Sequence, residues 1–104
     1  MSKNANVATG PGGTADAREL VEGVAKALGC HAEEVLVAST GVIGRRYPMD
    51  RVRGHLSAMP VPEGTDIDPV AAAIMTTDTH PKTASATAGA ARVVGVAKGV
   101  GTRC

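Results

Sequence analysis

Three short segments of the chain carry residue types from which a polar binding site can be built. Residues 39–44, Ser-Thr-Gly-Val-Ile-Gly, form a glycine-containing turn directly after an apolar run. Residues 76–79, Thr-Thr-Asp-Thr, gather hydroxyls around a carboxylate, and Lys98 precedes a glycine near the end of the chain. Backbone amides in such a turn can point into a cleft, and hydroxyls can bind a polar substrate. An ordinary tight turn at 39–44 and turn capping by Thr and Asp at 76–79 stay open as alternatives.

Composition excludes several classes of partner and location. The chain has 104 residues, which permits one small domain at most. Lys plus Arg number 11 against 10 Asp plus Glu, a net charge of +1, so we expect neither a nucleic-acid nor a membrane partner. No apolar run approaches the ~20 residues of a membrane-spanning helix, and the N-terminus lacks the ~7–15 apolar residues of a secretory signal. We therefore expect a soluble, cytoplasmic protein.

Other candidate sites are weaker. Residues 9–13, Thr-Gly-Pro-Gly-Gly, lack the pattern of a phosphate-binding loop and are predicted to be a plain loop. Asp50 lies among four arginines, which favours a solvated helix face over an anion site. The three histidines have no second ligand at metal spacing, and the two cysteines are predicted to be free thiols. These groups are Arg45, Arg46, Arg51 and Arg53; His31, His55 and His80; Cys30 and Cys104.

The elements that must position these residues alternate between helix and strand. Helical spacing predicts a helix over 14–28, with Thr14 as N-cap and Gly29 just past its end. Further helices are predicted over 48–59, opened by Pro48, and over 68–75. A strand buried on both faces is predicted over 35–38, and a hairpin over 83–87 and 92–97. Residues 60–65 are predicted to form a linker.

Four blocks of the sequence, taken in order, resemble the ornithine acetyltransferase family, the bifunctional glutamate N-acetyltransferases of arginine biosynthesis. The blocks are Asn4-Ala5-Asn6 with Thr9-Gly10; residues 38–44; residues 73–82, Ala-Ile-Met-Thr-Thr-Asp-Thr-His-Pro-Lys; and residues 97–101, Ala-Lys-Gly-Val-Gly. The resemblance covers residues 3–101. It implies that 1–104 is a single partial domain, from the middle to the end of the family's α chain. The implied fold is α+β, an incomplete part of a layered αββα sandwich.

The resemblance also implies the roles of four residues. Thr40 and Gly41 match the pair that forms the family's oxyanion hole, and Thr76 and Lys98 match its substrate-binding residues. The family's nucleophile is a Thr that autocatalytic cleavage leaves at the start of a β chain. Its position, counted forward from Lys98, lies beyond Cys104, so we expect no nucleophile in this chain. No metal is implied.

The resemblance thus implies a fragment of a multifunctional acyltransferase that moves acetyl from N-acetylornithine to glutamate. Acetyl-CoA is a further acetyl donor in bifunctional members, no cofactor stays bound, and the β chain completes an α2β2 heterotetramer. Whether this chain is itself an enzyme stays open, and we expect it to be inactive alone. The alternative is a non-catalytic amino-acid-binding or interaction module that complements a separate catalytic chain. The β-aminopeptidases are a weaker resemblance, because their Ser nucleophile context is also absent.

The aromatic content bears on stability. Tyr47 is the one aromatic residue, and the chain has no Phe and no Trp. Aromatic side chains usually supply the largest single burials in a core. We therefore expect the isolated chain to be loose, oligomeric or prone to aggregation.

Overall fold

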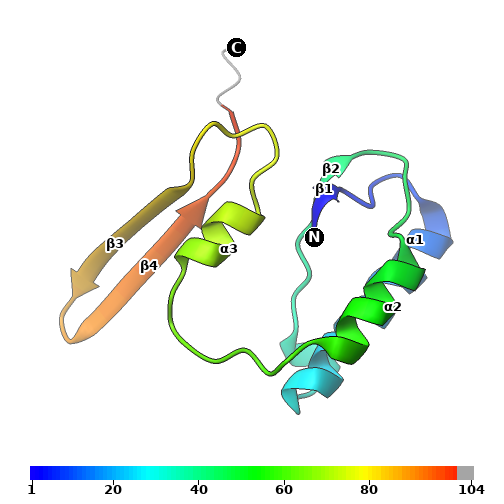
Figure 1. The fold of residues 1–104 in the computed structure, drawn as a ribbon, viewed down its shortest axis with the longest axis horizontal. Helices are drawn as coiled ribbons and strands as arrows, with labels where there is room; N and C mark the ends of the chain where they lie inside the picture. Colours follow the sequence, from blue (N-terminus) through cyan, green and yellow to red (C-terminus); the bar gives the residue numbers. More distant parts are fainter. Residues whose placement is uncertain (101–104) are drawn as a thin grey trace. The chain divides into compact units, whose positions relative to one another are not determined.

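The computed structural model describes residues 1–100 and contains both helices and strands, which confirms the predicted mixed class at that level (Figure 1). The elements, in chain order, are β1 (Ser2–Asn4), α1 (Gly10–Leu28), the 3-10 turn η1 (Ala32–Glu34), β2 (Thr40–Val42), α2 (Met49–Ala58), α3 (Asp68–Ala73), β3 (Lys82–Ala88) and β4 (Ala91–Ala97). The chain divides into two compact units, one of Met1 with Lys3–Glu63 and one of Ser2 with the residues from Gly64 onward. Each unit is described by itself. The single partial domain stays a prediction.

The first unit is built on a parallel strand pair joined through a helix. The Thr40 amide donates to the Met1 carbonyl at 3.1 Å, and the Ala5 amide donates to the Val42 carbonyl at 3.0 Å. Residue numbers rise together along both segments, so β1 and β2 run in the same direction. Parallel neighbours need a long crossover, and α1 supplies it.

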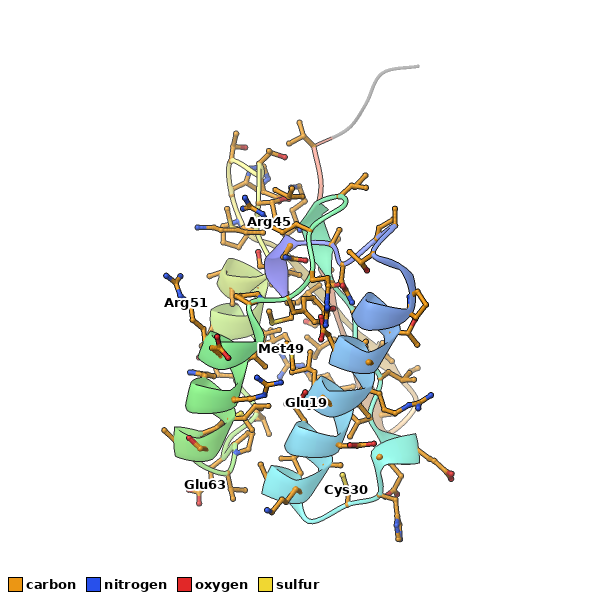
Figure 2. All side chains as sticks on the ribbon, turned by 90° about the vertical axis from the view of Figure 1, so that its right-hand side faces the viewer. Glu19, Cys30, Arg45, Met49, Arg51 and Glu63 are labelled. Carbon is orange, nitrogen blue, oxygen red and sulfur yellow. The ribbon has the colours of Figure 1, made fainter. Side chains whose placement is uncertain are left out.

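The core of this unit lies where α1 and α2 pack side by side (Figures 1 and 2). Tyr47 is only 5% exposed, so the single aromatic residue of the chain is fully used in packing. The cluster consists of Leu20, Tyr47, Met49 and Val52, with Ala17, Val24 and Leu56 packed against it.

Helix α1 begins four residues earlier than the sequence indicates. The predicted N-cap at Thr14 and the predicted loop over 10–13 are both wrong, because Thr9 is the N-cap and Pro11 lies in the first turn, where proline is tolerated. Gly13 is needed for space, whereas a side chain at Gly12 would require the end of the Arg46 side chain to shift. A Cβ on Gly12 would lie 2.8 Å from Arg46 Nη1, and one on Gly13 would lie 2.6 Å from Thr9 Cβ. The predicted end is confirmed, since Gly29 closes the helix with φ +70°.

The strand predicted over residues 35–38 is wrong. That segment has no regular structure, and the Leu36 side chain is 96% exposed. The strand lies instead at Thr40–Val42, inside the segment predicted as a turn, because those residues pair with β1. An apolar run becomes a buried strand only where a neighbouring strand and covering layers exist, and the described chain supplies neither here.

The predictions for the remaining elements are largely confirmed. Helix α2 follows Pro48, and 59–67 has no regular structure. Helix α3 ends at Ala73, two residues before the predicted end. Strands β3 and β4 pair antiparallel from Lys82↔Ala97 to Ala88↔Ala91. Nearly every residue of this hairpin is exposed, so it has little packing of its own.

We predict opposite effects of adding a methyl group at two helical glycines. Gly54→Ala, where a Cβ meets nothing within 4 Å, should raise the free energy of unfolding by about 0.5–1 kcal/mol through helix propensity. Gly13→Ala should lower it by about 1–3 kcal/mol, because the methyl overlaps the Thr9 side chain. Urea unfolding followed by far-ultraviolet circular dichroism measures both. Equal stabilisation by the two substitutions would contradict the packing described at the start of α1.

Candidate functional site

The two pairs of predicted site residues lie in different units of the structure. Thr40 and Gly41 belong to β2, in the unit that ends at Glu63. Thr76 and Lys98 belong to the unit that begins at Gly64, where Thr76 follows α3 and Lys98 follows β4. Each pair is therefore described within its own unit.

Gly41 lies against the backbone of β1. Its φ is +139°, and a Cβ at this position would lie 2.2 Å from the carbonyl carbon of Lys3 and 2.5 Å from the Asn4 nitrogen. Lys3 itself has a positive φ of +69°, which is uncommon for a residue with a side chain. Only glycine permits this approach, so Gly41 has a structural role whatever chemistry it serves.

The residues on either side of Gly41 are hydrogen-bonded to the segment that contains β1. Thr40 donates its amide hydrogen to Met1, and the Val42 carbonyl accepts from Ala5. Residues 40 and 42 therefore make the contacts with β1. Successive residues of a strand address opposite edges, so we expect the Gly41 amide to point to the other edge of β2. The sheet has two strands, which leaves that edge unpaired within the described residues.

The first block of the family resemblance builds the entry to α1. The buried Asn4 side chain donates to the Arg46 carbonyl at 2.9 Å and accepts the Asn6 amide at 2.8 Å. Asn6, with φ +50°, donates its side-chain amide to the Gly13 carbonyl and accepts from the Thr9 hydroxyl. These bonds give Asn4, Asn6 and Thr9 a structural role.

Arg46 connects this network to α1. Its Nε donates to Asp16 Oδ2 at 2.7 Å and its Nη2 to Asp16 Oδ1 at 2.6 Å, a bidentate pair. The hydrogen bonds from Arg46 lower the pKa of Asp16 below its ordinary value. The side chain of Asp16 is only 5% exposed. The lowered pKa keeps this buried carboxylate charged.

The structure brings Thr76 and Lys98 together. Lys98 Nζ donates to Thr76 Oγ1 at 3.2 Å, across 22 residues of sequence. A hydroxyl that accepts from an ammonium group still has its own hydrogen to donate. The pair can therefore present an ammonium charge and a hydroxyl donor to one anionic group.

Sequence reasoning did not place Asp78 among the site residues, but its carboxylate lies next to this pair. Asp78 Oδ1 accepts from Lys82 Nζ at 2.8 Å and from the Gly99 amide at 2.6 Å, and Oδ2 accepts from the Thr76 amide at 3.2 Å. The bond from Lys82, followed by those from the two amides, holds the pKa of Asp78 far below its usual range. The spacing of Asp78 and Lys82 was a possible signal in the sequence, whereas the contact with Gly99 needs the fold.

Two of the four arginines beside α2, Arg46 and Arg53, form ion pairs. Arg46 pairs with Asp16, and Arg53 pairs with Glu19 and Asp50. Arg51 is exposed and points away from α1 (Figure 2). Arg46 and Arg53 are therefore compensated by carboxylates, which does not favour an anion site built on all four arginines.

The remaining candidates contribute no site in the part of the chain that the structure describes. Within residues 1–100, no three or more His, Cys, Asp or Glu side chains are placed to hold a metal ion. Cys30 is a free thiol, as predicted, whereas Cys104 lies outside the described residues, as does Gly101 of the fourth block. The described helices include none that is long and apolar enough to cross a membrane.

Comparison with known proteins agrees with these motifs. A family model described as the ArgJ family matches residues 1–103. A glutamate N-acetyltransferase, Oat2 of Streptomyces clavuligerus, is 54% identical over 102 residues, which are 97% of this chain and 26% of that protein. The arginine biosynthesis bifunctional protein ArgJ 2 of a Nostoc strain is 51% identical over 102 residues, with the same shares. This chain thus spans about a quarter of the length of these relatives.

A solved structure extends the likeness to the fold. The crystal structure of the arginine biosynthesis bifunctional protein ArgJ from Bacillus halodurans matches with a TM-score of 0.85 and 34% identity, over 99% of this chain and 56% of that chain. The family model matches nearly the whole chain, and two relatives are more than 50% identical to it, so the family of the chain is established. The chain belongs to the ArgJ family.

Proposed function

We propose that this chain supplies oxyanion and substrate-binding residues to an enzyme that moves acetyl from N-acetylornithine to glutamate. The bond between Lys98 Nζ and Thr76 Oγ1 carries the proposal, because it joins the two residues that the family resemblance assigns to the substrate. The names of the relatives, glutamate N-acetyltransferase and arginine biosynthesis bifunctional protein, support the same activity.

Thr76 and Lys98 bind the carboxylate of the acetyl amino acid. Lys98 acts as a point charge that attracts the carboxylate. Thr76 accepts from Lys98 and donates its own hydrogen to the carboxylate. Both donors then face one anion, an arrangement that favours the amino-acid end of the substrate over an uncharged analogue.

Thr40 and Gly41 stabilise the negative oxygen that develops when the acetyl carbonyl is attacked. The Thr40 amide already donates to Met1, so we assign the role to the Thr40 hydroxyl and the Gly41 amide. Removing one such donor from an oxyanion hole costs about 3–4 kcal/mol of transition-state stabilisation. Within residues 1–100, the edge of β2 opposite β1 pairs with no strand, which supports this assignment for Gly41.

The rest of the machinery is proposed from the family resemblance. The nucleophile is a Thr outside these 104 residues, freed by autocatalytic cleavage at the start of a β chain. Its α-amine, with an unperturbed pKa of about 8, accepts the hydroxyl proton. The assembled enzyme is an α2β2 heterotetramer with a layered αββα sandwich fold, works in the cytoplasm, and needs no metal or bound cofactor. Acetyl-CoA serves as a second donor if the enzyme is bifunctional.

The first prediction concerns complementation. We expect no acetyl transfer from N-acetylornithine to glutamate by this chain alone, and transfer when it is mixed with a chain that begins at the family's Thr. Mass spectrometry of N-acetylglutamate measures the product. Transfer by the chain alone would show that the account of the nucleophile is wrong. Binding of N-acetylornithine to the chain, with no transfer in the mixture, would favour the alternative of a non-catalytic amino-acid-binding module.

A second prediction separates the roles of the two pairs in that mixture. Lys98→Met should raise KM for N-acetylornithine at least about tenfold with a smaller change in kcat, because it removes a contact made before and during reaction. Thr40→Val should lower kcat by about 100-fold or more with little change in KM, because an oxyanion forms only in the transition state.

Matched controls keep these effects specific. Lys26→Met removes an exposed lysine in the last turn of α1, and Thr83→Val removes an exposed hydroxyl on β3. Neither should change KM or kcat by more than about twofold. A tenfold rise of KM in Thr40→Val with unchanged kcat would reject the oxyanion assignment.

A further inference from the structure

The Asp78 carboxylate is the most heavily bonded side chain in its unit. Its side chain has no exposed surface, and three donors from three separate segments converge on its two oxygens. The Thr76 amide comes from the turn after α3, Lys82 Nζ comes from the start of β3, and the Gly99 amide comes from the residue after Lys98. The carboxylate therefore joins the turn to both strands of the hairpin.

A turn cap alone does not require this arrangement. An Asp that caps its own turn needs only a nearby amide, as the one from Thr76 to Oδ2. The bond from Gly99 spans 21 residues and holds the backbone next to Lys98. The two backbone positions that carry the Lys98 and Thr76 side chains are thus tied to one carboxylate.

We propose that Asp78 is a positioning residue, which holds Thr76 and Lys98 at hydrogen-bonding distance and thereby sets the affinity for the substrate carboxylate. This inference rests on the function proposed above. The bonds to the Thr76 and Gly99 amides fix the main chain on both sides, and the Lys98 Nζ to Thr76 Oγ1 contact of 3.2 Å follows from that geometry.

Lys82 has a separate part in the same cluster. It forms an ion pair with Asp78 at 2.8 Å and neutralises the carboxylate charge. The net charge of the Asp78, Lys82 and Lys98 side chains is then positive, which favours an anionic ligand. Without Lys82, the uncompensated negative charge of Asp78 would repel the substrate carboxylate.

The test compares Asp78→Asn with Asp66→Asn in the complemented enzyme. Asp66 is a matched control, because its Oδ1 accepts one backbone amide, that of Asp68, at 3.0 Å in the same unit. We expect Asp78→Asn to raise KM for N-acetylornithine about tenfold with kcat changed less than about twofold, and Asp66→Asn to change neither. An equal KM in the two variants would overturn the inference.

A second readout is independent of acetyl transfer. Amide hydrogen exchange, followed by nuclear magnetic resonance on the complemented enzyme with this chain isotope-labelled, should quicken at Gly99 and Thr76 by about tenfold in Asp78→Asn and stay unchanged in Asp66→Asn. Unchanged exchange at Gly99 would reject the positioning role. Faster exchange there, with no transfer in the wild-type mixture, would support the positioning role and reject the proposed function.

Lys82→Met is a second variant, which separates the positioning role of Asp78 from a general loss of folding in Asp78→Asn. It leaves the carboxylate and both amide bonds in place, so exchange at Gly99 should change less than in Asp78→Asn. KM should still rise, because the carboxylate charge is no longer neutralised. A fall in KM would contradict the charge argument.

The pH dependence of Gly99 protection gives a further check. Because the folded-state pKa of Asp78 is depressed, the bonds it accepts are at full strength above the ordinary pKa of an Asp, about 3.9. Protection of Gly99, corrected for the intrinsic exchange rate, should persist as the pH falls to that value and weaken only below it. Loss of protection between pH 6 and about 4 would show that another group controls this contact.

Discussion

The bidentate pair between Arg46 and Asp16 is the contact on which the first unit depends. It fixes α1 to the segment between β2 and α2, and the carbonyl of the same arginine accepts the Asn4 side chain, which fixes β1. The guanidinium also lies beside Gly12, so a methyl group added there would require it to shift. Removing Arg46, whose side chain is half-exposed, would leave the buried Asp16 carboxylate without its partner, which costs more than the net stabilisation of the pair suggests. One side chain thus connects the helix, the strand pair and the core beside α2.

Elements with local causes could be predicted from the sequence, and elements with distant causes could not. The end of α1 at Gly29 and the hairpin of β3 and β4 depend on neighbouring residues, and both predictions are confirmed. The first four residues of α1 are three glycines and a proline, which local patterns assign to a loop, and the Arg46 contact with Asp16 beside them spans 30 residues. The strand at Thr40–Val42 depends on β1, and nothing near it in sequence indicates which of the residues from 35 to 44 will pair.

The candidate site follows the same division. Thr76 and Lys98 are identifiable through the family resemblance, and their hydrogen bond brings them together within one unit. Asp78 looks in sequence like a turn residue, because two of its three donors are local and the third, Gly99, comes from the far end of β4. Gly41 shows the converse case. A glycine at position 41 is required by the close approach of β1, and a glycine is also expected at an oxyanion site. Residue type alone therefore cannot separate a structural from a chemical role.

The parallel pairing of β1 and β2 also sets an order in time. The β3–β4 hairpin closes over a two-residue turn, and such hairpins form within about 1–10 μs. The strand pair that contains Thr40 and Gly41 must first close a loop of nearly forty residues and place α1 across it, so it forms later and more slowly. On a ribosome, β1 emerges well before its partner strand and must wait for it. The proposed oxyanion residues are therefore among the last parts of their unit to acquire native geometry.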